Sequence, residues 1–199
     1  MAQLKPQLEQ VQRNWPQGYG YGLGGEVAEQ AETFASAGRS LALAILLVFA
    51  VLALQLQSFA QPLIILLSVP FALVGVIWGF YWTGIAFSFT AFVGIIAMVG
   101  IVVNDAIVMV DTMNRRQAEG ERLRDAALGG LRDRFRPILT TSLTTIVSLI
   151  PLALTNPTWL PLASAIIFGL TMATVTALVI IPCLYLLLSP RDALSGLDF

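Results

Sequence analysis

Two polar residues, Asn104 and Asp105, interrupt an apolar stretch and are the strongest candidates for chemistry in this chain. They lie in the sequence GIVVNDAIVMVDTMNRR, residues 100–116. A charged side chain inside a membrane helix costs about 2.5–3.5 kcal/mol on insertion scales, and such residues usually mark ion or proton pathways. Burial also disfavours the charged form of a carboxyl, as a proton carrier requires. We expect Asp105 to carry protons. The alternative is a protonated Asp105 that only forms a hydrogen bond with a neighbouring helix.

The residues around Asp105 differ in what they can do. Asn104 can donate and accept hydrogen bonds but cannot titrate. Asp111 lies nearer the end of the apolar stretch with Arg115 one turn further on, so we expect a structural ion pair there. An intramembrane aspartyl protease would need Asp105 and Asp111 to share a water. Six residues separate them by about 9 Å along a helix and turn them to different faces, so we do not expect an aspartyl protease.

A second polar group lies in a later apolar run. Four of its hydroxyl residues follow the spacing i, i+3, i+4 and i+7 and share one helix face: Thr141, Thr144, Thr145 and Ser148. Such hydroxyls can bond to their own backbone, or they can face Asp105 and hold water or relay a proton. The second interpretation predicts a proton pathway made of four residues: Asp105, Asn104, Thr141 and Thr145.

The elements that position these residues are five apolar runs, each of about the 20 residues that a spanning helix needs. They are predicted at residues 40–58, 62–83, 89–112, 137–155 and 160–188. The second run carries Gly75 and Gly79, a spacing that permits close helix packing. Five such runs are too many to bury in a soluble core of 199 residues. The fold class predicted is therefore all-α and integral to the membrane.

Composition supports this class and excludes several kinds of site. Hydrophobic residues make up 57% of the chain and charged residues 12%, against about 25% charged in soluble domains. The single cysteine, Cys183, excludes an internal disulfide and any cysteine cluster for a metal. The chain has no histidine, the commonest metal ligand. We expect no cofactor and no nucleic-acid partner, and membrane lipid as the surroundings.

Charge placement predicts the orientation. Seven of the eleven Lys and Arg residues lie between the third and fourth runs: Arg115, Arg116, Arg122, Arg124, Arg132, Arg134 and Arg136. The positive-inside rule makes residues 113–136 a cytoplasmic loop. Alternation then makes residues 1–39 a short periplasmic segment and residues 189–199 a cytoplasmic tail.

Within the basic loop, apolar residues recur at intervals of four. They are Leu123, Ala127, Leu131 and Phe135. This pattern predicts an amphipathic helix lying on the membrane surface, weakened by the pair Gly129 and Gly130. The alternative is a solvated connector.

Three motifs in order carry a family resemblance: GIVVNDAIVMVDTMNRR, RFRPILTTSLTTIVSLIPLAL, and LASAIIFGL followed by VIIPCLYLL. Together they strongly resemble the C-terminal end of the inner-membrane permease of the resistance–nodulation–division (RND) efflux transporters. The segment WPQGYGYGLGGEVAEQAETFAS resembles the end of the periplasmic porter domain, and the five runs resemble transmembrane helices eight to twelve. The resemblance therefore covers nearly the whole chain.

The resemblance implies proton-driven export by a multi-pass protein of the bacterial inner membrane. Family members are homotrimers that work with a periplasmic adaptor and an outer-membrane channel. In well-studied drug pumps the tenth helix brings a lysine to the proton site. Asn104 matches that lysine, Asp105 the asparagine after it, and Thr141 a threonine of the eleventh helix. The five runs contain no lysine, so either Asp105 carries protons itself or the relay differs.

A full pump of this family is about five times longer than this chain. We therefore expect the chain to be one half-fragment of a permease that needs the remaining part of the protein, since transporter folds place their site between two repeats. Alone, it is not expected to transport. The alternative is a non-transporting membrane scaffold or assembly partner. The substrate, whether drug, metal or lipid, depends on the porter domain and is not readable here.

Overall fold

The computed structural model describes the backbone of residues 26–188 and the side chains of residues 32–188. Most of the segment predicted to be periplasmic, and all of the predicted tail at 189–199, lie outside the described residues. The chain divides into two compact units, residues 1–40 and residues 41–199. The described part of the first unit is the beginning of one helix, and the second unit contains the rest.

Five long helices make up the described structure. They are α2 (Glu26–Leu56), α3 (Ala60–Thr83), α4 (Phe89–Ala118), α5 (Leu123–Thr155) and α6 (Leu160–Leu188). Each is long and apolar enough to cross a membrane. The prediction of an all-α fold with five spanning helices is confirmed.

The helices continue beyond the apolar runs, most clearly around the predicted loop at 113–136. There α4 extends to Ala118 and α5 already begins at Leu123, so only residues 119–122 connect the two helices. Polar and charged residues such as Arg, Gln and Glu are good helix formers, and outside the hydrocarbon they carry no insertion penalty. The apolar pattern therefore marks the membrane thickness and not the ends of the helices.

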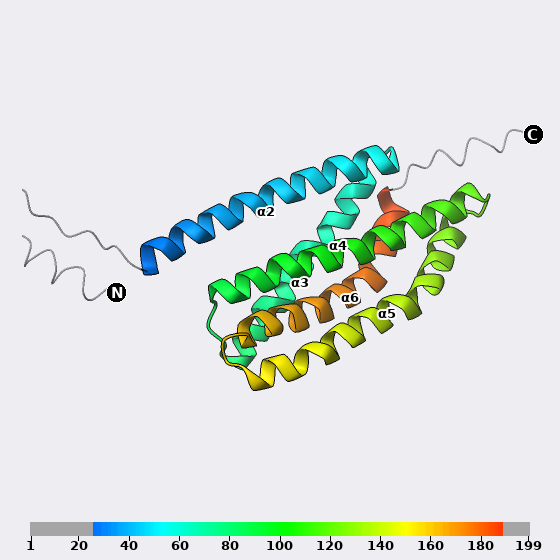
Figure 1. Cartoon of the computed structure of the whole chain (residues 1–199). Coiled ribbons are helices and arrows are strands. Elements are labelled where there is room, and N and C mark those ends of the chain that lie inside the picture. Colours follow the sequence, from blue (N-terminus) through cyan, green and yellow to red (C-terminus); the bar gives the residue numbers. More distant parts are fainter. Residues whose placement is uncertain (1–25, 189–199) are drawn as a thin grey trace, which may run out of the picture. The chain divides into compact units, whose positions relative to one another are not determined.

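Helix α6 is packed among α3, α4 and α5 (Figure 1). Its contact with α3 depends on the predicted glycine pair. A Cβ atom at Gly75 would lie 2.5 Å from Met172 Cβ, and one at Gly79 would lie 2.1 Å from Phe168 Cγ. Its contact with α4 depends on Gly94, where a Cβ would lie 2.6 Å from the Leu162 carbonyl oxygen. Small residues allow helices to approach closely in lipid, where no hydrophobic force drives them together.

Two helices stand out by their exposed apolar faces. In the second unit, α2 buries Leu52, whereas Leu46 and Leu54 of the same helix are 63% and 81% exposed. Helix α5 likewise leaves Leu143 and Leu154 63% and 80% exposed. A helix that is apolar on its outer face suits contact with lipid tails.

A hydrogen-bonded network joins α3, α4 and α6 near one end of the bundle. The amides of Gln61 and Asn114 donate to each other, at 2.9 Å from Gln61 Nε2 and 2.7 Å from Asn114 Nδ2. The Tyr185 hydroxyl, whose residue is fully buried, lies 2.6 Å from Asn114 Oδ1 and 3.0 Å from Gln117 Oε1, to which it can donate. One side chain from each of three helices thus meets at Asn114.

We expect Gly94→Ala to destabilise the bundle by about 1–3 kcal/mol, the usual cost of overpacking. The added methyl group would meet the backbone of α6, which cannot move aside as a flexible side chain can. Gly100→Ala on the same helix is the matched control, because nothing lies within 4 Å of a Cβ there. The free energy of unfolding, measured by SDS titration in detergent micelles, compares the two. Equal values for both variants would contradict close packing at Gly94.

We expect Tyr185→Phe to lower the free energy of unfolding by about 1 kcal/mol, since it removes one buried hydrogen-bond donor. Tyr81→Phe should change it by less than about 0.5 kcal/mol, because Tyr81 is 82% exposed. The same titration measures both variants. A Tyr185→Phe protein as stable as the parent would show that the hydroxyl does not hold the three helices together.

Candidate functional site

Asp105 and Asn104 lie in the middle of α4, next to each other but on different sides of the helix. Asp105 is half-buried, and Asn104 is exposed. Their neighbours Val103 and Ala106 are buried in the apolar core. Among the residues that the structure describes, none forms a hydrogen bond or an ion pair with the Asp105 carboxyl. Asp105 thus lies within a spanning helix, as the sequence predicts. Residues 32–188 contain no hydrogen-bond partner for its carboxyl.

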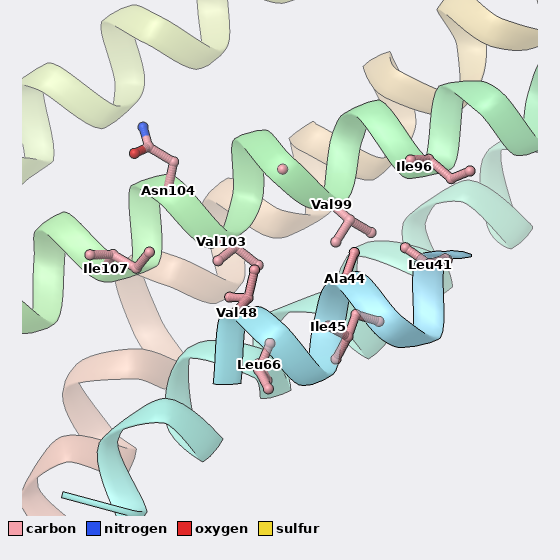
Figure 2. A pocket seen from close by; sticks show the side chains of 11 residues that line it. Leu41, Ala44, Ile45, Val48, Leu66, Ile96, Val99, Val103, Asn104 and Ile107 are labelled. Carbon is pink, nitrogen blue, oxygen red and sulfur yellow. The ribbon is translucent and has the colours of Figure 1, made fainter. Parts of the chain in front are cut away.

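Asn104 borders an apolar cavity of about 260 Å³ between α2 and α4 (Figure 2). Ten of its eleven lining residues are apolar, Gly100 among them, and Asn104 brings the single polar side chain. Figure 2 shows Ala44 and Val48 of α2 near Val99 and Val103 of α4, while the Asn104 amide points away from them. A stable water needs two to four polar partners, so this cavity is not suited to conduct protons.

The hydroxyl residues of α5 bond to their own helix. Thr141 Oγ1 donates to the Ile138 carbonyl at 3.0 Å, and Thr145 Oγ1 donates to the Thr141 carbonyl at 2.8 Å. Thr144 and Ser148 bond to their own helix in the same way. Within the described residues, no hydrogen bond joins this face to Asp105. The structure therefore does not bring Thr141 and Thr145 together with Asp105, and their part in a proton pathway remains a prediction.

The polar side chain that α5 directs into the bundle is Ser142, which adjoins the predicted face. Ser142 is buried, and its hydroxyl accepts a hydrogen bond of 2.7 Å from Thr174 of α6. Thr174 also lies 2.7 Å from the Leu170 carbonyl, to which its hydroxyl can donate. The spacing pattern drew attention to the row of four hydroxyl residues at 141, 144, 145 and 148. Ser142 lies outside that row and was therefore not singled out.

A second, polar cavity of about 490 Å³ lies at the end of α4 that carries Asp111. Asp111 is exposed, and the cavity is also lined by Gln61, Asn114 and Gln117 from the network described above. The expected ion pair between Asp111 and Arg115 is replaced by one between Arg115 and Glu119, at 4.0 Å. Both carboxylates lie one turn from Arg115, so spacing alone could not choose between them.

The amide and tyrosine residues of this region were missed by the sequence interpretation. They are Gln61, Asn114, Gln117 and Tyr185. Each lies at an end of an apolar run, where polar residues are common. Only the packing of three helices shows that they meet, and the sequence offers no spacing rule that relates residues this far apart.

Arginine residues fasten α4 to α5. The Arg116 guanidinium bonds to Glu121 at 2.6 Å and to Asp133 at 2.9 Å. It fits against α5 because Gly129 has no side chain, and a Cβ there would lie 2.6 Å from Arg116 Nη1. Arg134 Nε donates to Thr112 Oγ1 at 2.7 Å. Two of the seven clustered arginines, Arg116 and Arg134, thus join α4 to α5.

A metal site is not among the features of this region. Within the described ranges, no three His, Cys, Asp or Glu side chains lie close enough to hold a metal ion. The described residues offer three features for function: one carboxyl in the middle of a membrane span, polar regions at the helix ends, and closely packed helices.

Comparison with known proteins gives one consistent result. The model of the AcrB/AcrD/AcrF family matches residues 1–189. The swarming motility protein SwrC of Bacillus subtilis is 36% identical over 167 residues, which are 81% of this chain and 16% of that protein. The cobalt-zinc-cadmium resistance protein CzcA of Cupriavidus metallidurans is 32% identical over 187 residues, 92% of this chain and 18% of that protein.

A solved structure agrees with these sequence matches. A crystal structure of a heavy-metal efflux pump superimposes with a TM-score of 0.75 at 30% identity, covering 94% of this chain and 19% of that one. This chain thus spans less than a fifth of the length of these relatives. Its sequence and its helices agree with the same group of transporters, and the chain belongs to the AcrB/AcrD/AcrF family of RND efflux permeases.

Proposed function

We propose that this chain supplies the second set of membrane helices of a proton-driven RND efflux permease, with Asp105 as the group that takes up and releases the proton. The proposal rests on the position of the Asp105 carboxyl and on its missing partner. This carboxyl is half-buried in the middle of a spanning helix and has no hydrogen-bond partner among the described residues. A carboxyl in lipid needs a partner, which in this proposal comes from the remaining part of the permease.

The size of the chain supports the same proposal. It covers 16% of SwrC and 18% of CzcA, and transporter sites lie between two repeats of the fold. The exposed apolar faces of α2 and α5 leave room for further helices or lipid. In this proposal the chain does not export on its own, and the complete permease is a homotrimer that works with a periplasmic adaptor and an outer-membrane channel.

The relatives that match this segment are named for different substrates. One matched relative is named for cobalt, zinc and cadmium resistance, and another, MdtC of Pectobacterium atrosepticum, for multidrug resistance. MdtC is 37% identical over 148 residues, 72% of this chain. Since a similar sequence occurs in relatives named for metals and for drugs, we assign this segment to energy coupling and not to the choice of substrate.

The proposed location is the bacterial inner membrane, with the N-terminus in the periplasm and the C-terminus in the cytoplasm. The connection at residues 119–122 should then face the cytoplasm, because seven arginines lie in it or beside it. The turn at residues 156–159 should face the periplasm.

Single-cysteine labelling tests this orientation in a Cys183→Ser background. Glu119→Cys should be protected from an impermeant thiol reagent added to whole spheroplasts, and Thr158→Cys should be labelled fully. The two positions are exposed at opposite ends of the spanning helices, so each serves as the control for the other. Labelling of Glu119→Cys from outside would reverse the proposed topology.

Substitution of Asp105 tests the proposed proton role, in a full-length permease that contains this segment. Asp105→Asn keeps the size and the hydrogen bonding but cannot titrate, so export should fall to background while the protein is still made. Asp111→Asn is the matched control and should keep most of the activity, because Asp111 is exposed. Asn104→Ala should lie between them, since an interhelical hydrogen bond is worth only about 0.6 kcal/mol on average.

Efflux in inverted vesicles at matched protein levels measures all three variants. Dissipation of the proton gradient should abolish export by the parent and leave the Asp105→Asn variant unchanged. Export by Asp105→Asn at the parental rate would show that this carboxyl is structural and that the proton moves elsewhere in the permease.

A further inference from the structure

The first part of α5 reaches beyond the hydrocarbon of the membrane. The helix has 33 residues and is therefore about 50 Å long, whereas the hydrocarbon is about 30 Å thick and takes about 20 residues. The apolar residues 137–155 fill that thickness. Residues 123–136 then lie outside the hydrocarbon, on the side of the lipid headgroups. Pro137 is inside α5, where a proline bends a helix, and Figure 1 shows α5 changing direction in its first half.

One face of residues 123–136 is occupied by the protein itself. Ala126, Ala127 and Gly130 are buried, and Leu123 and Leu131 pack against the core. A Cβ at Gly130 would lie 2.6 Å from Met113 Cγ of α4. The apolar face predicted to rest on the membrane surface thus packs against the protein's own core for three of its four residues, Leu123, Ala127 and Leu131. The sequence showed an amphipathic helix correctly but did not show which partner its apolar face covers.

The opposite face of residues 123–136 is basic and is exposed in the described structure. Five residues at 124, 128, 132, 135 and 136 share a side of the helix, and we call them the basic stripe: Arg124, Leu128, Arg132, Phe135 and Arg136. All five are exposed. Leu128 and Phe135 leave 43% and 49% of their surface uncovered on the same side of the helix as the three arginines.

We propose that the basic stripe binds the phosphate groups of anionic phospholipids, with Leu128 and Phe135 entering the outer edge of the acyl chains. Arginine forms paired hydrogen bonds with phosphate, and basic residues beside a spanning helix attract anionic lipid. An interfacial helix buries apolar side chains at the boundary of headgroups and acyl chains. This combination of residue types fits a lipid surface better than bulk water.

The charges around the stripe support this partner. The acidic Glu121 and Asp133 are already paired with Arg116, so they do not neutralise the stripe. Asp125 is exposed beside it and opposes the three arginines with one negative charge. The proposal does not depend on the direction of transport or on the proton role of Asp105, because the end of a spanning helix meets headgroups in either orientation.

Native mass spectrometry of the full chain in detergent tests the preference. The probes are phosphatidylglycerol and phosphatidylcholine with identical acyl chains, added in equal amounts. The parent should retain phosphatidylglycerol in preference. Arg132→Gln should reduce that preference about fivefold, the value of one basic residue near a membrane surface. Arg115→Gln is the matched control and should leave the preference unchanged, since Arg115 is on α4 and lies near Glu119.

A probe at position 128 tests the location of the stripe. Leu128→Cys in a Cys183→Ser background, labelled with a spin label, should become inaccessible to a water-soluble relaxing agent in nanodiscs that contain phosphatidylglycerol. Equal retention of the two lipids by the parent, or equal loss in Arg132→Gln and Arg115→Gln, would overturn the proposal. A label that stays fully accessible to water would also overturn it, because the stripe would then be solvated and not in contact with lipid.

Discussion

Lipid offers no hydrogen-bond partner to the polypeptide backbone, and the described structure depends on this constraint. Each segment that crosses the membrane must satisfy its own N–H and C=O groups, which a helix does without a partner. The five elements between residues 26 and 188 are accordingly helices of 24 to 33 residues. The same constraint explains the threonine and serine residues of α5, whose hydroxyls donate to carbonyls three or four residues back.

A helix bundle in lipid must be held together by close packing and by a few polar contacts. In this chain α6 serves as the common partner of α3, α4 and α5. Glycines at the contacts let the helices approach closely. Hydrogen bonds such as the one between Thr174 and Ser142 are directional and help to fix which helix faces meet. The amide network at Asn114 and the ion pairs of Arg116 lie at the helix ends. Polar groups are less costly there than in the middle of the membrane.

Asp105 differs from the polar groups that support this frame. Hydroxyls of α5 such as those of Thr141 and Thr145 bond to their own helix, and polar groups at the helix ends bond to a neighbour, whereas the Asp105 carboxyl has no partner among the described residues. Within the same residues its neighbour Asn104 is unbonded too, but Asn104 is exposed and cannot titrate. Proteins usually break a local rule where function requires it. The combination of a costly group and a missing partner is what makes the proton role the leading proposal, together with membership of a family of transporters. The same reasoning separates Asp105 from Asp111, which is exposed next to a polar cavity.

The sequence by itself determined the class of protein, the number of spanning helices and the family, because apolar runs of about 20 residues and ordered motifs are local features. It also singled out Asp105 from its position within such a run. Tertiary structure alone decided which faces meet. It placed Ser142, and not Thr141 or Thr145, against α6, brought Gln61, Asn114 and Tyr185 together, and packed Leu123 and Leu131 against the hydrophobic core. In a helix with apolar residues on nearly all sides, the sequence does not indicate which side is buried against the protein and which faces lipid. Its orientation is therefore set by close packing against the neighbouring helices.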